Sequence, residues 1–277
     1  MYRVSKVLNN NGVIAIDMEE NQEYVILGKG VGFGKKVSQR FDKPAECTLY
    51  RLEQETERGS AKELVKGIEP EYLEIADEIL TEAQKVFGDS VDRGILFPLA
   101  DHISFAVARI RRNEQISNPL TEDIKVLFYS EFKVAETLKT ILKKRLQIAI
   151  DDHEVGYVAL HIHSAIGDEK VSVAMQTARA VRECIDMIEK ATGKPIDVLS
   201  LSYNRLMNHM KYMVARASTG EKLNLDMNEY MLDQYPQAYE IAADICKNLE
   251  GCIGHKLDET EIGYLAMHIQ RVYKDAV

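Results

Sequence analysis

An internal repeat is the feature that most limits how this 277-residue chain can fold. Residues 155–162 align with residues 262–269 without a gap. The offset between these two segments also matches further residues upstream. The matched pairs are Leu99 with Leu206, His102 with His209, Val107 with Val214, Ala108 with Ala215 and Arg109 with Arg216. Each copy has the length of an ordinary domain. The repeat therefore predicts two versions of one domain, in residues 65–170 and 171–277.

Both copies carry the hydrophobic spacing of helices. From about residue 60, apolar residues recur at three- and four-residue intervals, beginning with Tyr72, Ile75, Ala76, Ile79, Leu80 and Ala83. Asp151-x-x-Glu154 and Asp258-x-x-Glu261 match the capping box of a helix start, in which the second acid turns back to the backbone of the first. We therefore expect two duplicated all-α helical bundles.

Residues 1–58 have the pattern of a small antiparallel all-β domain. Residues 3–8 alternate in polarity, and Asn9-Asn10-Asn11-Gly12 has the composition of a tight turn. Apolar runs at 13–16, 23–27 and 47–52 complete four predicted strands. Glycine at every second position from 28 to 34 predicts a tight loop from which Lys29 and Phe33 project. Because such a sheet has a small core, we expect it to dimerise and bury one face against its copy.

Charge and cysteine content narrow the class of protein. The net charge is −9, yet residues 1–43 hold seven basic and five acidic side chains, which hints at a polyanionic partner for the first part. The four cysteines form no C-x-x-C pair, as expected of reduced thiols in a cytoplasmic protein. No apolar run approaches the roughly 20 residues that span a bilayer, and the N-terminus resembles no signal peptide. We expect no membrane insertion.

Four histidines are retained by the repeat. The separation between His102 and His161 is the same as that between His209 and His268. Nearby polar residues change between the copies, since Asp101 is matched by Asn208, Ser104 by Lys211 and His163 by Gln270. A lone histidine on an apolar helix is ordinarily a core residue, but retention at two positions in each copy favours a functional role.

The sequence disfavours two of the three common roles of histidine, namely metal binding and enzymatic catalysis. A helical metal site favours ligands at i and i+4, whereas His161 and His163 are at i and i+2 and point apart. The sequence contains no G-x-S-x-G, H-E-x-x-H or P-loop pattern, so we expect no metal or cofactor and no enzymatic activity. A neutral imidazole is nucleophilic near its pKa of about 6.5, and phosphorylation adds about −1.5 to −2 charges. The remaining interpretation is that these histidines accept phosphoryl groups and so act as an electrostatic switch.

Several motifs together resemble a known family. They are residues 6–11 (KVLNNN), 28–36 (GKGVGFGKK), 101–103 (DHI), 159–162 (ALHI) and 268–269 (HI). Across essentially the whole chain they resemble the bacterial transcriptional antiterminators of the BglG/SacY family, and HIHSA at 161–165 looks most like the branch that controls glucose-uptake genes. The resemblance implies a co-antiterminator RNA-binding domain (1–58) and two phosphotransferase-regulation domains (65–170 and 171–277).

The resemblance also implies a mechanism. The N-terminal domain would bind, as a symmetric homodimer, a leader-mRNA hairpin that overlaps a terminator. The implied RNA contacts are Lys6, Asn11, Gly28, Lys29 and Phe33, with Asn9 and Lys35 as supports. Phosphoryl groups would arrive at His102 and His161 in connection with the sugar-specific enzyme II permease, and at His209 and His268 from the phosphocarrier protein HPr. No role is implied for His163.

Two other classes of protein remain as alternatives. One is a DNA-binding activator with the same regulatory domains, which would begin with a helix-turn-helix segment, whereas residues 1–52 have strand patterning. The other is an enzyme, either a phosphohistidine phosphotransferase or a metal-dependent hydrolase that uses the paired histidines.

Overall fold

The computed structural model describes residues 1–52, 55–56, 59–114, 116–167, 170–193, 195–197 and 200–275. The chain divides into two compact units, Met1–Asn118 with Ser130–Val171, and Pro119–Tyr129 with Ser172–Val277. The end of the predicted first domain, at residue 58, lies outside the described residues. Among the helices of the described part, none is both long and apolar enough to cross a membrane.

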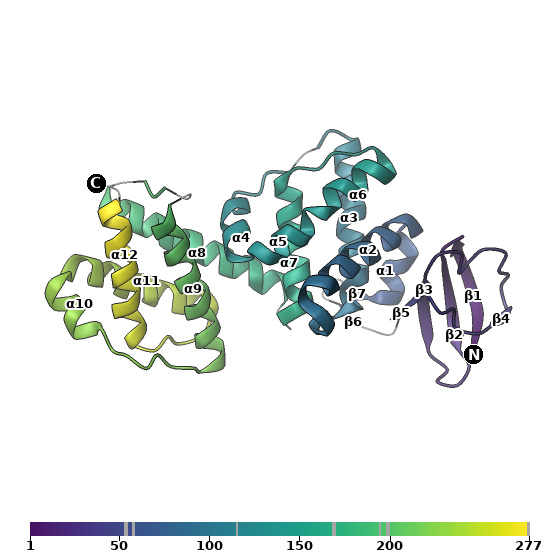
Figure 1. The fold of residues 1–277 in the computed structure, drawn as a ribbon, viewed down its shortest axis with the longest axis horizontal. Coiled ribbons are helices and arrows are strands. Elements are labelled where there is room, and N and C mark those ends of the chain that lie inside the picture. Colours follow the sequence, from purple (N-terminus) through teal and green to yellow (C-terminus); the bar gives the residue numbers. More distant parts are fainter. Residues whose placement is uncertain are drawn as a thin grey trace. The chain divides into compact units, whose positions relative to one another are not determined.

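A five-stranded antiparallel sheet begins the first unit (Figure 1). Its strand order is β4-β1-β2-β3-β5, and a separate short pair, β6-β7, follows it. The bounds are β1 Tyr2–Asn9, β2 Gly12–Asp17, β3 Glu23–Leu27, β4 Arg40–Phe41, β5 Thr48–Arg51, β6 Glu55–Thr56 and β7 Gly59–Ser60. The expected strands are confirmed, while two-residue β4 is too short to give an alternation signal.

Both faces of this sheet are covered within the chain. Val13, Ala15 and Ile26 form a buried cluster on one face. The opposite face carries Val25 and Tyr50, which are paired across β3 and β5 and are 0% and 3% exposed. The ring of Tyr50 packs edge-on against that of Phe97, in the helix that spans Leu96–Arg111, with the ring centroids 6.3 Å apart. The helices therefore cover the second face.

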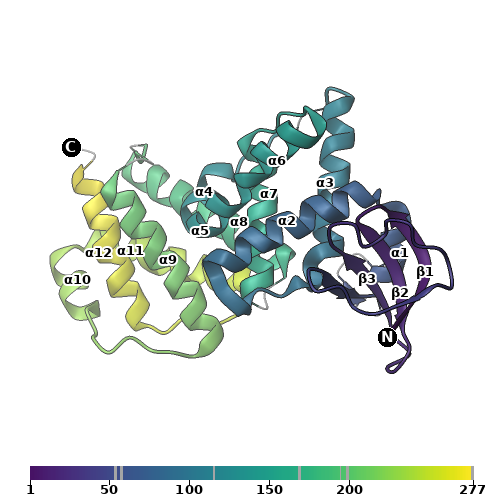
Figure 2. The same cartoon turned by 45° about the vertical axis from the view of Figure 1, so that its right-hand side comes forward.

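Helices α1, α6 and α7 of the first unit pack on α2 or α3 (Figure 2). Their bounds are α1 Ala61–Gly67, α2 Pro70–Phe87, α3 Leu96–Arg111, α5 Tyr129–Ala135, α6 Thr137–Leu146 and α7 Asp152–Gly167, with 3-10 turns at Gly88–Ser90 and Arg93–Ile95. The periodic apolar residues of α2 are buried, as their spacing predicts. The fold class, a small β-sheet domain followed by helical bundles, is confirmed.

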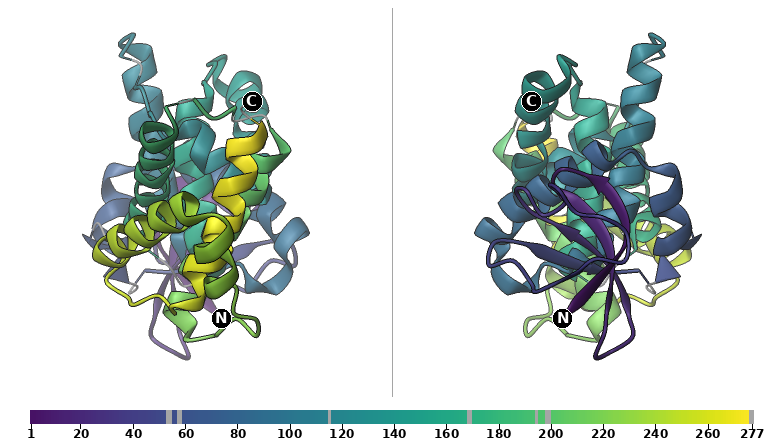
Figure 3. Two further views of the ribbon diagram at one scale, coloured as in Figure 1. Left: turned by 90° about the vertical axis from the view of Figure 1, so that its left-hand side faces the viewer. Right: turned by 90° about the vertical axis from the view of Figure 1, so that its right-hand side faces the viewer.

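The regular structure described in the second unit consists of helices joined by loops (Figure 3). Its bounds are α4 Thr121–Leu127, α8 Val171–Thr192, α9 Leu201–Thr219, α10 Asn228–Gln234, α11 Pro236–Ile253 and α12 Thr260–Asp275. Helix α12, yellow in Figure 3, packs against α9, α10 and α11. This arrangement brings the histidine-bearing faces of α9 and α12 together.

Helix α4 breaks the symmetry of the repeat. Its counterpart in the second copy is α10, which packs on α12. Helix α4 packs instead on α9, where the hydroxyl of Tyr203 donates a 3.0 Å hydrogen bond to buried Asp123. The repeat matches Asp123 with exposed Tyr230, and Tyr203 with Leu96. The pair that holds α4 in the second unit thus has no equivalent between the copies.

The turn after β1 and the glycine-rich loop contact each other closely at Gly32. We expect Gly32→Ala to destabilise the sheet by about 1–3 kcal/mol, because the added Cβ would lie 2.0 Å from the carbonyl oxygen of Asn9. Gly67→Ala is the control, since its Cβ would meet no atom within 4 Å. The urea unfolding midpoint of each full-length variant measures the effect, and equal midpoints for the two variants would contradict this account.

Candidate functional site

The structure joins the two sequence motifs of the sheet domain at one edge. The backbone N–H of Gly28 donates to the carbonyl oxygen of Asn11 at 2.9 Å, and that of Gly30 donates to the side-chain oxygen of Asn11 at 3.0 Å. The N–H of Gly32 donates to the carbonyl oxygen of Asn10 at 3.0 Å. Residues 9–12 and 28–34 therefore form one continuous surface, which we call the loop edge.

Two of the predicted contact residues project from the loop edge. Phe33 is 74% exposed and Lys29 is exposed, as the alternating glycines predict. The fold itself requires glycine at position 28, because a Cβ there would lie 2.5 Å from the carbonyl oxygen of Glu46. An exposed aromatic ring beside a lysine can stack on an unpaired base and contact its phosphate.

The predicted lysines lie in different places. Lys6 is exposed on β1, where its backbone is paired with Ile14. The ammonium group of Lys35 lies 4.8 Å from the ring centroid of Phe41 in β4. These contacts of Lys6 and Lys35 are made with β2 and β4, and not with the asparagines of the loop edge.

Both predicted asparagines bind a residue of helix α2. Nδ2 of Asn9 donates to Oε1 of Glu74 at 2.7 Å, and Nδ2 of Asn11 donates to Oε2 of Glu74 at 3.3 Å. The side-chain oxygen of Asn9 accepts from the backbone N–H of Asn11 at 2.8 Å. The loop edge is thus occupied by a carboxylate of the same chain.

The first histidine pair lies between α3 and α7. The ring centroids of His102 and His161 are 5.4 Å apart, and that of Tyr157 is 5.7 Å from His102. Nε2 of His102 lies 3.4 Å from Oε2 of Glu154, whose carboxylate accepts 2.8 and 3.1 Å hydrogen bonds from Nη2 of Arg109. Residues at i, i+3 and i+7 share one helix face, which explains why α7 presents all three of its side chains to α3.

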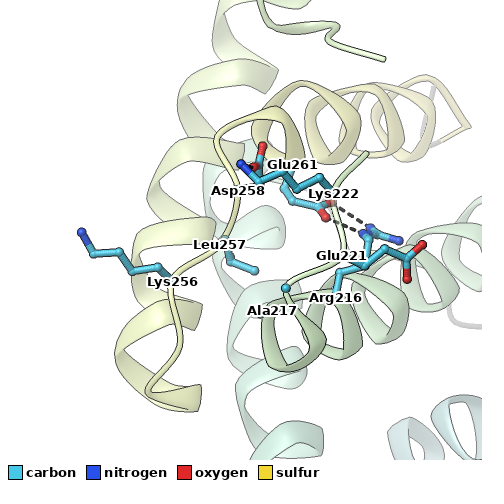
Figure 4. A pocket seen from close by; sticks show the side chains of 9 residues that line it. Arg216, Ala217, Glu221, Lys222, Lys256, Leu257, Asp258 and Glu261 are labelled. Atoms are coloured by element: carbon cyan, nitrogen blue, oxygen red, sulfur yellow. Dashed lines mark hydrogen bonds and ion pairs between the residues drawn. The ribbon is translucent and has the colours of Figure 1, made fainter. Parts of the chain in front are cut away.

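The second unit repeats this arrangement between α9 and α12. His209 and His268 are stacked, with ring centroids 4.8 Å apart, and Tyr264 stacks 6.2 Å from His209. Nε2 of His209 lies 3.7 Å from Oε2 of Glu261. Arg216 binds both oxygens of Glu261, through Nε at 2.6 Å and Nη2 at 2.9 Å, as the dashed lines in Figure 4 show. The duplication has therefore retained a five-residue site.

Burial keeps the second histidine pair neutral. It lowers the pKa of His209 to about 3, with smaller contributions from His268 and Arg216. It also lowers the pKa of His268 to about 4, helped by the charges of Arg271 and Arg205. Near pH 7 both imidazoles therefore carry an available lone pair.

Glu154 is held in its charged form. Burial alone would raise the pKa of this carboxyl, but its interactions with His102 and Arg109 outweigh burial and lower the pKa. In the second unit, the bidentate bond to Glu261 raises the pKa of the Arg216 guanidinium. The second site therefore combines two neutral histidines with a carboxylate that Arg216 holds on both oxygens, and the first site has the same type of paired carboxylate in Glu154.

Three buried histidine nitrogens have no hydrogen-bond partner among the residues that the structure describes. They are Nε2 of His102, Nε2 of His209 and Nδ1 of His268. Buried polar atoms are nearly always paired, so each exception calls for an explanation. Nε2 of His102 and Nε2 of His209 lie 3.4 and 3.7 Å from a glutamate oxygen without forming a hydrogen bond. A new covalent bond can therefore form at such a nitrogen without the loss of a hydrogen bond.

Sequence analysis missed the residues that hold the histidines, and it misread two of them. Glu154 and Glu261 are not reciprocal capping-box residues: Asp151 accepts the N–H of Glu154 at 3.2 Å, but the Glu154 carboxylate turns to Arg109 instead. Asp258 binds the N–H and hydroxyl of Thr260. The signal was present, because the repeat pairs Arg109 with Arg216, Glu154 with Glu261 and Tyr157 with Tyr264.

His163 belongs to a separate contact. Its Nδ1 lies 2.9 Å from Oε1 of Glu131, a buried acid of α5. His161 faces His102, so the two histidines at i and i+2 have different partners, as expected. The second copy has Gln270 and Ala238 at the corresponding positions, so both members of the pair are changed together.

A surface hollow lies beside the second histidine site. It has a volume of about 170 Å³ and is lined by the end of α9 and the start of α12 (Figure 4). Arg216 and Glu261 form part of its wall, and Lys222 binds Asp258 at its rim. Within the part of the chain that the structure describes, no group of three or more His, Cys, Asp or Glu side chains is arranged to hold a metal ion.

Comparison with known proteins identifies all three parts of the chain. Residues 2–59 match the family model of the CAT RNA binding domain, and residues 77–165 and 182–272 each match that of the PRD domain. These matches agree with the resemblance to antiterminators. They disfavour a helix-turn-helix activator, because the CAT match covers the N-terminal strands.

Individual relatives extend over the whole chain. The "GlcA/glcB genes antiterminator" of Staphylococcus carnosus is 31% identical over 274 residues, which cover 97% of this chain and 94% of the relative. "Transcription antiterminator LicT" of Bacillus subtilis is 28% identical and covers 99% of this chain and 100% of its own. A crystal structure of GlcT CAT-PRDI matches with a TM-score of 0.52 at 28% identity, over 60% of this chain and 98% of the solved one.

Stability should decrease in acid because of the second histidine pair. Unfolded histidine takes up a proton near pH 6.5, whereas the folded-state pKa values of about 3 for His209 and about 4 for His268 delay protonation. As the pH falls from 6.5 to about 4, each histidine therefore lowers the free energy of unfolding by about 1.4 kcal/mol per pH unit. The full stability is present above this window.

Urea unfolding across this pH range tests the effect. His209→Gln should reduce the slope of stability against pH by about 1.4 kcal/mol per unit, because one proton-binding group is removed. His255→Gln serves as the control, since that side chain is exposed. The account is wrong if both variants keep the slope of the unmodified protein.

Proposed function

The chain belongs to the family of transcription antiterminators that join a CAT RNA binding domain to two PRD domains, and on this premise we propose that it binds a leader-mRNA hairpin. Holding the hairpin prevents a terminator from forming, so that RNA polymerase reads into a sugar-uptake operon. The protein is in this account a regulator and not an enzyme. We propose that the RNA-binding domain spans residues 1–58 and that the two regulation domains span residues 65–170 and 171–277.

The loop edge is the observation that supports RNA binding most directly. It combines Asn11, whose amide can both donate to and accept from a base edge, with exposed Lys29 and Phe33. Gly28 keeps the backbone close beneath them, and Lys6 and Lys35 add positive charge along the sheet. Amide, aromatic and cationic groups on one surface suit an RNA with unpaired bases.

We propose that RNA is bound by a homodimer. A single sheet offers one loop edge, and a hairpin with two asymmetric internal loops presents two sites. The names of the relatives, an antiterminator of glcA/glcB genes and GlcT, favour a glucose-uptake operon as the target.

The paired histidines are the proposed phosphoryl acceptors. Neutral His209 and His268 offer a lone pair at physiological pH, and His102 and His161 occupy the equivalent positions of the first copy. In each transfer the bond between the donor side chain and phosphorus breaks, and a nitrogen–phosphorus bond forms at the acceptor imidazole. The proposed donors are HPr for the second copy and the enzyme II permease of the sugar phosphotransferase system for the first.

Phosphorylation changes the charge balance of each site. It adds about −1.5 to −2 charges beside a buried carboxylate, Glu154 or Glu261, which lies 3.4 or 3.7 Å from the nearest histidine nitrogen. Buried like charges repel strongly, so the helices must move apart or Arg109 and Arg216 must turn toward the phosphoryl group. Arg109 and Arg216 are therefore positioning residues, and the repacking they permit is the proposed switch.

RNA binding by the full chain tests the first part of the proposal. We expect tight binding to one hairpin of a panel with paired asymmetric internal loops, and none to a matched DNA duplex. Asn11→Ala should weaken binding tenfold or more, since a base-edge contact contributes about 1–3 kcal/mol. Affinity should fall with salt, with a log–log slope of about −0.7 for each phosphate contacted.

The control for this measurement is Asn21→Gly. Asn21 is exposed at the opposite end of the β2–β3 hairpin, and its φ of 54° suits glycine. Binding that survives high salt, or that Asn11→Ala and Asn21→Gly weaken equally, would argue against RNA recognition at the loop edge.

Phosphoryl uptake tests the second part. Incubation with phosphorylated HPr should add acid-labile phosphate in stoichiometric amounts, without turnover, and the combined change of His209 and His268 to Ala should remove that addition. Arg216→Ala should slow uptake about tenfold, with partial rescue by Arg216→Lys, because a cation beside the acceptor stabilises the incoming charge. Intact-protein mass spectrometry gives stoichiometry and rate, with His255→Gln as the control. Equal uptake by the double variant would place the acceptor elsewhere.

A further inference from the structure

The loop edge and helix α2 recognise each other in detail. Asn9 and Asn11 use their side-chain oxygens to organise the edge, accepting from backbone N–H groups at 2.8 and 3.0 Å. Their two amide NH2 groups remain, and both donate to the single carboxylate of Glu74. Each oxygen of Glu74 receives one of these bonds, so the carboxylate is bound in a bidentate manner.

The surface that meets the loop edge is acidic. Glu71, Glu74 and Glu78 follow one another at intervals of three and four residues along α2 and so lie on one face, which we call the acidic face. Arg145 of α6 fixes it, with Nη1 3.2 Å from Oε2 of Glu74 and Nη2 3.0 Å from Oε2 of Glu78. Among these carboxylates Glu74 is the one that both asparagines bind, so it offers the loop edge a fixed oxygen acceptor, as the polar edge of a base does.

Two further contacts join the sheet to α2 and to the segments around it. The hydroxyl of Tyr50 donates to Asp77 of α2 and accepts a 2.9 Å hydrogen bond from Nη2 of Arg93. Nζ of Lys62 in α1 lies 2.8 Å from Oε2 of Glu23 in β3. Contacts at three places on the sheet restrict how it can move relative to α2, so the bond to Glu74 is part of an interface.

We propose that the acidic face of α2 is a docking surface for the loop edge, on which Glu74 occupies the position of RNA. This inference rests on the proposed RNA-binding function of Asn9 and Asn11. Each amide NH2 has a second N–H, but an RNA acceptor cannot take the position that the Glu74 carboxylate fills between the two amides. RNA therefore binds only the fraction of molecules in which the sheet has left α2, and the apparent dissociation constant rises in proportion.

RNA titration of full-length variants tests the competition. Glu74→Ala removes the acceptor of both amides and should tighten RNA binding, roughly tenfold if the docked form holds about nine tenths of the molecules. Glu82→Ala is the matched control, because it removes the same charge from the same helix at a residue paired with Lys85 instead. Asn11→Ala in the Glu74→Ala background should lose the gain, since it removes the RNA contact.

A second measurement reads the contact itself without RNA. The side-chain amide NMR signals of Asn9 and Asn11 should shift in Glu74→Ala and stay in place in Glu82→Ala. Unshifted signals in Glu74→Ala would overturn the docking surface, because the amides would then have a different partner.

The outcomes separate this inference from the proposed function. If the unmodified chain binds RNA, Asn11→Ala abolishes binding and Glu74→Ala leaves the affinity unchanged within twofold, RNA recognition stands and the competition is refuted. If neither the unmodified chain nor Glu74→Ala binds any RNA of the panel, the proposed function fails and the competition fails with it. Binding by Glu74→Ala alone would support both.

Discussion

The buried bond between arginine and glutamate is the interaction on which each helical copy depends. Arg109 with Glu154, and Arg216 with Glu261, join the helix that carries the first histidine to the helix that carries the second. Removal of one partner would leave an uncompensated charge in a site where the glutamate side chain is 4% or 2% exposed. The same pair sets the distance between carboxylate and imidazole, so packing and chemistry are determined together.

Sequence reasoning predicted what local patterns encode. The strands at the N-terminus, the helical periodicity of α2 and the two histidine pairs all follow from spacing within one segment or from the repeat. It could not predict that Glu154 leaves its helix cap for Arg109, since the spacing of a capping box is the same whether or not the acid turns back. The contact of Asn9 with Glu74 joins residues 65 positions apart, and neither motif hints at the other.

The sheet domain must cover its apolar second face. Its second face needs a cover, because Val25 and Tyr50 would otherwise expose apolar surface, and the helices supply that cover within one chain. A partner sheet could supply it as well, which is the homodimer expected from the small core. In the structure the helices take that position, and Glu74 of the same helices binds the asparagines of the loop edge.

The packing of helix α4 on the second unit bears on how the two copies can have evolved. It was duplicated as part of the first copy but packs with the second, through the bond between Tyr203 and Asp123 that has no counterpart at the matching positions of the repeat. A gene cut at the boundary of the repeat would leave Asp123 without the hydroxyl that satisfies it. The two copies are therefore no longer interchangeable parts, and recombination between relatives should preserve them as one inherited block.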